Sequence, residues 1–474
     1  MNVRANFFWG TLSAIGRQGI NFIATIILAR LLLPSDYGIL GMLAIIISVS
    51  EIIIDAGLGG ALIRKKNVQP IDFATLTTYN VIVSFLLYLV IYLASPLISI
   101  LYDLDELTIL LRIYAITIII ESFSIVPKIL MIKELKTKQF AITNLVSGAL
   151  GLIVAIIMAK YKYGVYSLIF QYISTAAFFL IFSWYFSSYK IKFGFSIVSF
   201  RELFSFGINT TSANILRNIS ESVYNNIVAK IAPLNIAGYY NQSYKLQGVI
   251  GGIENSIIDS VLFPLLCRET ENFVERTCFL NNIISFIFIN LCFILMINST
   301  DLVLFLFGNQ WIDMVVFLKP LFFIGALQTF TSLYRNVFKI VGKTFLILRF
   351  EFVSFIVAIP TYIILLLSEQ YILVIYLFLA YSIIRLLMSI KYLSKVSSFS
   401  NNNIFRDSFR VLLLPFLSFV ILSCFNIDID IAPLFRIFVT TMLYLTVLIC
   451  CCEFVKHKEY KYIKKQLIVL INAK

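Results

Sequence analysis

Long runs of apolar residues follow one another along the whole chain and are separated by short polar segments. Most runs reach about 20 residues, the length at which a helix crosses the hydrocarbon core of a bilayer. Because lipid offers no partners for backbone amides, such runs form helices. The pattern therefore predicts about fourteen membrane-spanning helices. Their ranges are 6–33, 36–60, 73–102, 106–130, 139–159, 163–187, 203–231, 235–263, 277–299, 312–338, 344–367, 371–393, 409–425 and 432–454.

Composition supports an all-α membrane protein. Hydrophobic residues make up 60% of the 474 residues and charged residues only 13%, whereas soluble domains carry about 25% charged residues. Soluble enzymes and nucleic-acid binders are thereby excluded. The first apolar run is too long for a signal-peptide core and lacks a small-residue cleavage site, so we expect it to remain as a helix. With one histidine, and seven cysteines that fall mostly within or beside apolar segments, we expect neither a metal site nor a cofactor.

The basic residues predict the orientation. If the N-terminus lies in the cytoplasm, most of the 38 Lys and Arg residues fall in cytoplasmic loops, whereas the opposite loops carry mainly acids. Such an asymmetry follows the positive-inside rule. We therefore expect both termini on the cytoplasmic side of the membrane. The lysine-rich tail from Lys456 to Lys465 is expected to lie on anionic lipid headgroups.

A shift of the chain by 200 residues places the first predicted span on the seventh without a gap. Thr11, Ile15, Arg17, Ile27, Ala29 and Gly38 then fall on Thr211, Ile215, Arg217, Ile227, Ala229 and Gly238. Six spans separate the copies, so both have the same orientation in the membrane. The sequence predicts two six-helix lobes, 1–200 and 201–398, related by a pseudo-two-fold axis along the membrane normal. Two additional helices and a basic cytoplasmic tail, 399–474, follow them.

Polar residues recur on one face of the first two helices of each predicted lobe. Charge within a bilayer is costly, so each charged residue in a span is a functional candidate. If the four polar faces turn toward a central cavity, Arg17, Arg217 and Lys245 form a cationic patch that suits a phosphate or pyrophosphate, since guanidinium groups bind phosphoryl oxygens in a bidentate manner. The candidate substrate-binding residues are Arg17, Asn21, Arg217, Asn241, Lys245 and Asn255. The candidates for ion coupling or charge compensation are Glu51, Asp55, Glu221, Glu254 and Asp259.

The same charges have a structural interpretation. Arg217 and Glu221 are four residues apart on one helix and can neutralise each other. Arg17 can pair with Glu51 or Asp55 and lock two helices together. The sequence assigns no role to three further charged residues in or near predicted spans, namely Arg112, Glu121 and Lys319.

Two stretches carry a resemblance to a known family. One is Leu28-Ala-Arg-Leu-Leu-Leu-Pro-Ser-Asp-Tyr-Gly-Ile-Leu-Gly41, and the other is Asp55-Ala-Gly-Leu-Gly-Gly-Ala-Leu-Ile-Arg64. Together they resemble the Wzx-type oligosaccharide flippases, the polysaccharide biosynthesis proteins of the multidrug/oligosaccharidyl-lipid/polysaccharide exporter superfamily. The predicted arrangement of two six-helix lobes and an added pair is similar over nearly the whole chain.

The resemblance implies a substrate and a mechanism. The substrate would be undecaprenyl pyrophosphate carrying an O-antigen or exopolysaccharide repeat unit, moved to the outer leaflet by alternating access with an ion gradient as the energy source. Such a protein is not an enzyme, and a polysaccharide polymerase and chain-length machinery are its expected partners. Two alternatives stay open: a multidrug or toxin exporter of the same superfamily, and a membrane glycosyltransferase or polymerase.

Overall fold

The computed structural model describes residues 3–65, 67–187, 192–257, 273–340, 344–394, 401–424, 432–455 and 457–472. Helices make up nearly all of this part of the chain, and it contains no strand. Each predicted span corresponds to a helix or to a pair of consecutive helices. The prediction of an all-α membrane protein is confirmed.

The chain divides into two compact units, which we describe separately. The first comprises Met1–Asn241 and Glu351–Tyr371, and the second comprises Gln242–Phe350 and Ile372–Lys474. The predicted lobe boundaries at 200 and 398 stay a prediction.

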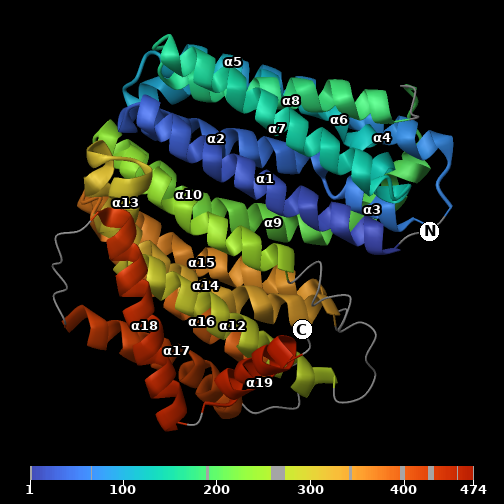
Figure 1. Cartoon of the computed structure of the whole chain (residues 1–474). Helices are drawn as coiled ribbons and strands as arrows, with labels where there is room; N and C mark the ends of the chain where they lie inside the picture. Colours follow the sequence, from blue (N-terminus) through green and yellow to red (C-terminus); the bar gives the residue numbers. More distant parts are fainter. Residues whose placement is uncertain are drawn as a thin grey trace. The chain divides into compact units, whose positions relative to one another are not determined.

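The first unit is built from long helices that run side by side (Figure 1). They are α1 (Val3–Leu31), α2 (Pro34–Asp55), α3 (Leu58–Arg64), α4 (Pro70–Tyr102), α5 (Leu107–Tyr114), α6 (Ile116–Lys133), α7 (Thr137–Lys160), α8 (Val165–Phe186) and α9 (Ile197–Ile231). Helix α7 packs between α8 and α1, α4 packs on α5 and α6, and α9 packs on α2 and α3.

The second unit is also built from helices that pack on one another. They are α12 (Phe273–Ile297), α13 (Ser299–Leu306), the 3₁₀ helix η2 (Asn309–Met314), α14 (Val315–Ile340), α16 (Leu373–Ser394), α17 (Asn401–Cys424), α18 (Pro433–Val455) and α19 (Lys458–Asn472). Helix α12 contacts α14, α17 and α19, and α18 contacts α13 and α17. Two helices contribute to both units, α10 (Leu234–Ile257) and α15 (Thr344–Ser368).

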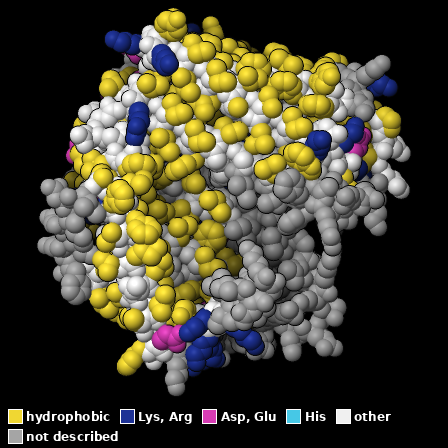
Figure 2. Space-filling model, in the orientation of Figure 1, with side chains coloured by type: hydrophobic (Ala, Val, Ile, Leu, Met, Phe, Trp, Pro, Cys, Tyr) yellow, Lys and Arg dark blue, Asp and Glu magenta, His cyan; other side chains and the backbone are white. Residues whose placement is uncertain are grey.

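Among the described residues, ten helical segments are long and apolar enough to cross a membrane. Helices α1, α9, α10 and α17 are not among them, although the sequence pattern predicts a span for each. Helices α1, α9 and α10 carry three of the four polar stripes, which lower their mean hydropathy, and α17 has a shorter apolar segment, Phe409–Ser423. Hydrophobic side chains cover much of the visible face of the molecule, as expected for a surface in contact with lipid (Figure 2).

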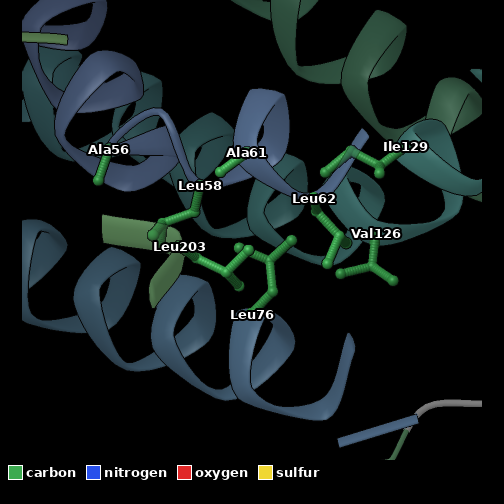
Figure 3. Packing of buried hydrophobic residues seen from close by; sticks show 8 residues of the cluster. All are labelled: Ala56, Leu58, Ala61, Leu62, Leu76, Val126, Ile129 and Leu203. Carbon is green, nitrogen blue, oxygen red and sulfur yellow. The ribbon is translucent and has the colours of Figure 1, made fainter. Parts of the chain in front are cut away.

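The second predicted span is broken after Asp55. Ala56 and Gly57 both adopt left-handed backbone conformations, with φ of 43° and 70°, so α2 ends and the short helix α3 starts in a new direction. Helix α3 packs against α4, α6 and α9 through a cluster of buried apolar residues (Figure 3). Its members are Ala56, Leu58, Ala61, Leu62, Leu76, Val126, Ile129 and Leu203.

Repeat-related glycines touch each other in the first unit. A Cβ atom on Gly38 would collide with the backbone oxygen of Leu234, and a Cβ atom on Gly238 would collide with the backbone oxygen of Pro34. A shift of 200 residues turns one contact into the other, because Gly38 corresponds to Gly238 and Pro34 to Leu234, and such reciprocity is the pattern of a two-fold contact. The start of α2 therefore crosses the start of α10 on the predicted pseudo-two-fold axis, with no room for side chains.

Arg112, to which the sequence assigns no role, replaces a hydrogen bond that is missing from helix α4. Pro96 has no N–H group, so the carbonyl of Tyr92 loses its helical donor. Ser95 Oγ donates to this carbonyl at 2.9 Å, and Arg112 donates from Nη2 at 3.4 Å. Arg112 Nε also donates to Ser95 Oγ at 3.0 Å, and the guanidinium lies 3.9 Å from the centre of the Tyr92 ring. Arg112 thus has a structural role.

Replacing Arg112 by leucine should lower the melting temperature of the protein purified in detergent. The change removes the charged donor to the Tyr92 carbonyl and the hydrogen bond to Ser95 Oγ, and hydrogen bonds of this kind contribute about 1.5–3 kcal/mol. Lys160→Leu, at an exposed helix end, is the control and should melt close to the wild type. Equal melting temperatures for Arg112→Leu and the wild type would show that the carbonyl is satisfied without the guanidinium.

Candidate functional site

Charged side chains from three helices of the first unit interact with one another within their spans. Arg17 lies on α1, Glu51 on α2, and Glu121 and Lys128 on α6. The charges of Arg17, Lys128 and Glu121 all act on Glu51, and those of Arg17 and Lys128 act on Glu121. Arg17, Glu51 and Lys128 have exposed side chains, and Glu121 is half-buried. We call these four residues the charged cluster.

Arg17 is the fifteenth residue of the 29-residue helix α1, so its charge lies near mid-membrane if α1 spans the bilayer. Its side chain is exposed, and its electrostatic partners are the carboxylates of Glu51 and Glu121, on which Lys128 also acts. A guanidinium in this position remains accessible to an anionic ligand. Asn21, one turn further along α1, is exposed as well.

Asp55 caps the short helix α3. Its carboxylate accepts a hydrogen bond from the backbone N–H of Gly57 at 3.3 Å, and the backbone of Gly59 is a second donor. Lys128 is its charged neighbour. Carboxylates at helix N-termini stabilise the unpaired amides there, so Asp55 has a structural task beside the predicted role in ion coupling, which stays a prediction.

Arg217, the repeat counterpart of Arg17, lies on α9. Its Nε is buried and has no hydrogen-bond partner among the described residues, and the same holds for Oδ1 of Asn225, two turns further along α9. A buried donor without an acceptor is costly, which makes this nitrogen a candidate for binding a ligand oxygen. The side chain of Glu221 lies outside the described residues.

The candidates on α10 are placed differently. Asn241 is buried and donates from Nδ2 to the backbone oxygen of Tyr37 at 2.7 Å, next to the glycine crossing. Asn255 donates to the backbone oxygen of Gly251 on its own helix at 2.8 Å. Lys245 is half-buried and Glu254 is almost completely buried. Asp259 lies outside the described residues. Lys245, Glu254 and Asn255 belong to the second unit, and their convergence with Arg17 stays a prediction.

The sequence left Glu121 unassigned, and Lys128, near the end of the predicted span 106–130, counted only among the basic residues of the cytoplasmic side. Glu121 lies in the middle of a long apolar span, and this position alone is a signal of function. Nothing in the sequence shows that α6 brings both residues to Glu51 of α2. No group of three or more potential metal ligands occurs in the described part of the chain.

A bundle of many apolar helices, with a charged cluster within its spans, defines the chain as a polytopic membrane protein. Residues 27–316 match the model of the polysaccharide biosynthesis protein family. The chain belongs to this family, and with it to the multidrug/oligosaccharidyl-lipid/polysaccharide exporter superfamily. The predicted family is confirmed.

Individual relatives are more distant. A membrane protein of the cps region of Klebsiella pneumoniae is 26% identical over 361 residues, which cover 74% of each chain. The succinoglycan biosynthesis transport protein ExoT of Rhizobium meliloti is 24% identical and aligns over 65% of this chain and 63% of its own length. The lipopolysaccharide biosynthesis protein WzxC of Escherichia coli is 22% identical over 68% of this chain and 66% of that protein.

Solved structures confirm the fold. The lipid II flippase MurJ in an inward closed conformation superimposes with a TM-score of 0.76 at 14% identity, over 94% of this chain and 98% of that chain. An inward-facing multidrug transporter of the MATE family gives a TM-score of 0.60 at 17% identity, over 82% of this chain and 99% of that chain.

Proposed function

We propose that the protein translocates a lipid-linked oligosaccharide, undecaprenyl pyrophosphate carrying an O-antigen or exopolysaccharide repeat unit, across the bacterial inner membrane. The substrate enters from the cytoplasmic leaflet and leaves to the outer leaflet by alternating access between two lobes. Both termini lie in the cytoplasm in this arrangement. Relatives named for the biosynthesis of succinoglycan and lipopolysaccharide support the substrate class.

The observation that carries the proposal is the exposed guanidinium of Arg17 at the middle of α1. A cation far from both ends of a spanning helix cannot reach the headgroups, so an accessible one serves best as the binding site of a mobile anion. Arg217, with its buried and unpartnered Nε, and Lys245 are the proposed partners of Arg17 in holding the pyrophosphate. Asn21, Asn241 and Asn255 are proposed to contact the sugar or the phosphate.

A multidrug exporter is the rival function. A site for cationic drugs favours a net negative cavity, and the two carboxylates of the charged cluster fit one. The cluster, however, contains as many cations as acids, and Arg217 matches the further carboxylate of Asp55 beside Lys128. These residues therefore do not make a net negative cavity, and the exposed guanidinium of Arg17 favours an anionic substrate.

The test is a flipping assay with the whole chain in proteoliposomes. A lipid-pyrophosphate oligosaccharide is placed in one leaflet, and its arrival in the other is followed by access of a membrane-impermeant glycosidase. We expect flipping of this substrate and no transport of a cationic dye. Transport of the dye without flipping of the lipid would establish the multidrug function instead.

We further propose that Glu51 and Glu121 take up the coupling ion. Two carboxylates that repel each other bind a proton or a cation more readily than one alone, and Arg17 and Lys128 act on both. Occupation of the pair would change the field at Arg17 and so couple the ion to release of the phosphate. Glu254 and Asp259 remain candidates for charge compensation.

Glu121→Gln should therefore flip substrate at the same rate with and without an imposed proton or sodium gradient, whereas the wild type is accelerated by one of them. The amide keeps the shape of the side chain and removes the charge. Glu106→Gln, in an exposed position at the start of α5, is the control and should respond as the wild type does. An undiminished response of Glu121→Gln would assign the coupling to other residues.

A further inference from the structure

The start of the C-terminal helix α19 packs against α12 and α17 of the second unit. His457 is completely buried, and its ring stacks on Phe286 of α12 with the ring centres 5.1 Å apart. Its Nδ1 lies 3.3 Å from the carboxylate of Glu459, which is also buried. Arg410 of α17 faces the same ring, and burial lowers the pKa of His457 below its usual value. The imidazole serves as a packing group at the joint between α18 and α19.

Two further contacts fix the rotation of α19 about its axis. The Tyr462 ring meets Phe279 of α12 edge to face, with the ring centres 5.3 Å apart. Lys464 pairs with Glu453 at the end of α18, and Tyr460 donates to the same carboxylate at 3.2 Å. These contacts with α12 and α18 determine which face of α19 points away from the rest of the second unit.

That remaining face is basic. Lys458, Lys461 and Lys465 are all exposed, and their spacing of three and four residues places them on one side of the helix. We call these residues the lysine face. Figure 2 shows Lys and Arg side chains gathered over α19, at the bottom of the view.

The adjoining helix shows the depth at which the lysine face lies. Helix α18 has 23 residues, about 34 Å of helix, which matches a hydrocarbon core of ~30 Å. Its last residues are apolar and open to the outside, with Phe454 91% exposed and Val455 45% exposed. Lys458 follows three residues later. The lysine face therefore starts where the hydrocarbon ends, at the level of the phosphate groups of the lipids.

We propose that the lysine face of α19 binds anionic phospholipid headgroups of the leaflet in which α18 ends, and that this contact holds the end of α18 at the membrane surface. Three exposed ammonium groups on one rigid face complement a layer of phosphates. Each basic residue near an anionic surface strengthens binding by about 1 kcal/mol, or roughly fivefold. The surface is distinct from the charged cluster and does not depend on the proposed function.

The test is hydrogen–deuterium exchange of the whole chain in nanodiscs of phosphatidylcholine, with and without phosphatidylglycerol. We expect amides 458–465 to exchange more slowly when phosphatidylglycerol is present, by roughly fivefold to tenfold. This difference should vanish at about 1 M salt, where the Debye length falls to about 3 Å. The triple variant Lys458→Gln, Lys461→Gln, Lys465→Gln should show no difference, whereas the control Lys160→Gln, Lys162→Gln should behave as the wild type.

Two results would overturn the proposal. One is equal exchange of these amides in both lipid mixtures. The other is an equal lipid effect in the triple variant and the wild type. If undecaprenyl pyrophosphate slows exchange of these amides and phosphatidylglycerol does not, the surface belongs to the substrate pathway and the proposal also fails. Retained protection of the peptide around His457 serves as the check that the triple variant is folded.

Discussion

Replacing Gly238 by alanine should abolish accumulation of the folded protein. The new methyl group would overlap the backbone oxygen of Pro34. A backbone carbonyl at the start of α2 cannot swing aside as a flexible side chain can. Overpacking of a core commonly costs about 1–3 kcal/mol, and we expect at least that much here. The measurement is the yield of monodisperse protein in fluorescence-detected size exclusion.

Gly248→Ala, on the same helix, is the matched control, because a Cβ atom there would meet nothing within 4 Å. It should accumulate as the wild type does. Gly38→Ala, at the repeat-related position, should resemble Gly238→Ala, since its methyl group would overlap the backbone oxygen of Leu234. Normal yields for both glycine variants would mean that α2 and α10 do not cross at this point, and the pseudo-two-fold contact would be wrong.

Arg17→Ala should lose flipping of lipid-pyrophosphate oligosaccharide while the protein inserts and accumulates normally. The guanidinium is exposed, so its removal leaves no cavity. A charge-assisted hydrogen bond contributes about 1.5–3 kcal/mol, and a bidentate contact contributes more. We expect a reduction of the rate by about tenfold to a hundredfold in the proteoliposome assay.

Arg17→Lys should keep part of the activity, because it retains the charge and loses the fork geometry. Arg30→Gln is the control on the same helix, since Arg30 lies at the end of α1 and is exposed. It should flip at the wild-type rate. Activity of Arg17→Ala equal to that of the control would remove Arg17 from the substrate site.

The helices and the repeat could be predicted from the sequence. Apolar runs show the spans directly, because the bilayer requires a fixed length and forces helical structure. The 200-residue repeat predicted a symmetric relation of Gly38 and Gly238, and the structure places the two glycines at one crossing. The polar stripes also explain why α1, α9 and α10 are less apolar than the other spans.

The break within the second span could not be predicted. Ala56 adopts a positive φ of 43°. Residues other than glycine rarely adopt this conformation, and no pattern in the sequence predicts it here. The role of Arg112 could not be predicted for a similar reason. The carbonyl of Tyr92 on α4 is available to Arg112 because Pro96, 16 residues earlier in the chain, has no N–H group to donate to it.

The charged cluster could be predicted only in part. Mid-span charges are visible in the sequence, and Arg17 and Glu51 were candidates for that reason. That Glu121 and Lys128 join them depends on how α6 packs in the first unit, which is a matter of tertiary contacts rather than of periodicity. The sequence instead grouped residues by helix and by repeat, which favoured Glu221 and Asp259 over Glu121.

The most direct test of the central claim is the affinity of the purified protein for a lipid-linked pyrophosphate. Native mass spectrometry can compare the wild type with the double variant Arg17→Ala, Arg217→Ala, using undecaprenyl pyrophosphate and an uncharged polyprenol. We expect the wild type to retain the pyrophosphate lipid and the double variant to lose at least about tenfold in affinity, with no change for the alcohol. Equal retention of the pyrophosphate lipid by both proteins would contradict a phosphate site built from these two arginines.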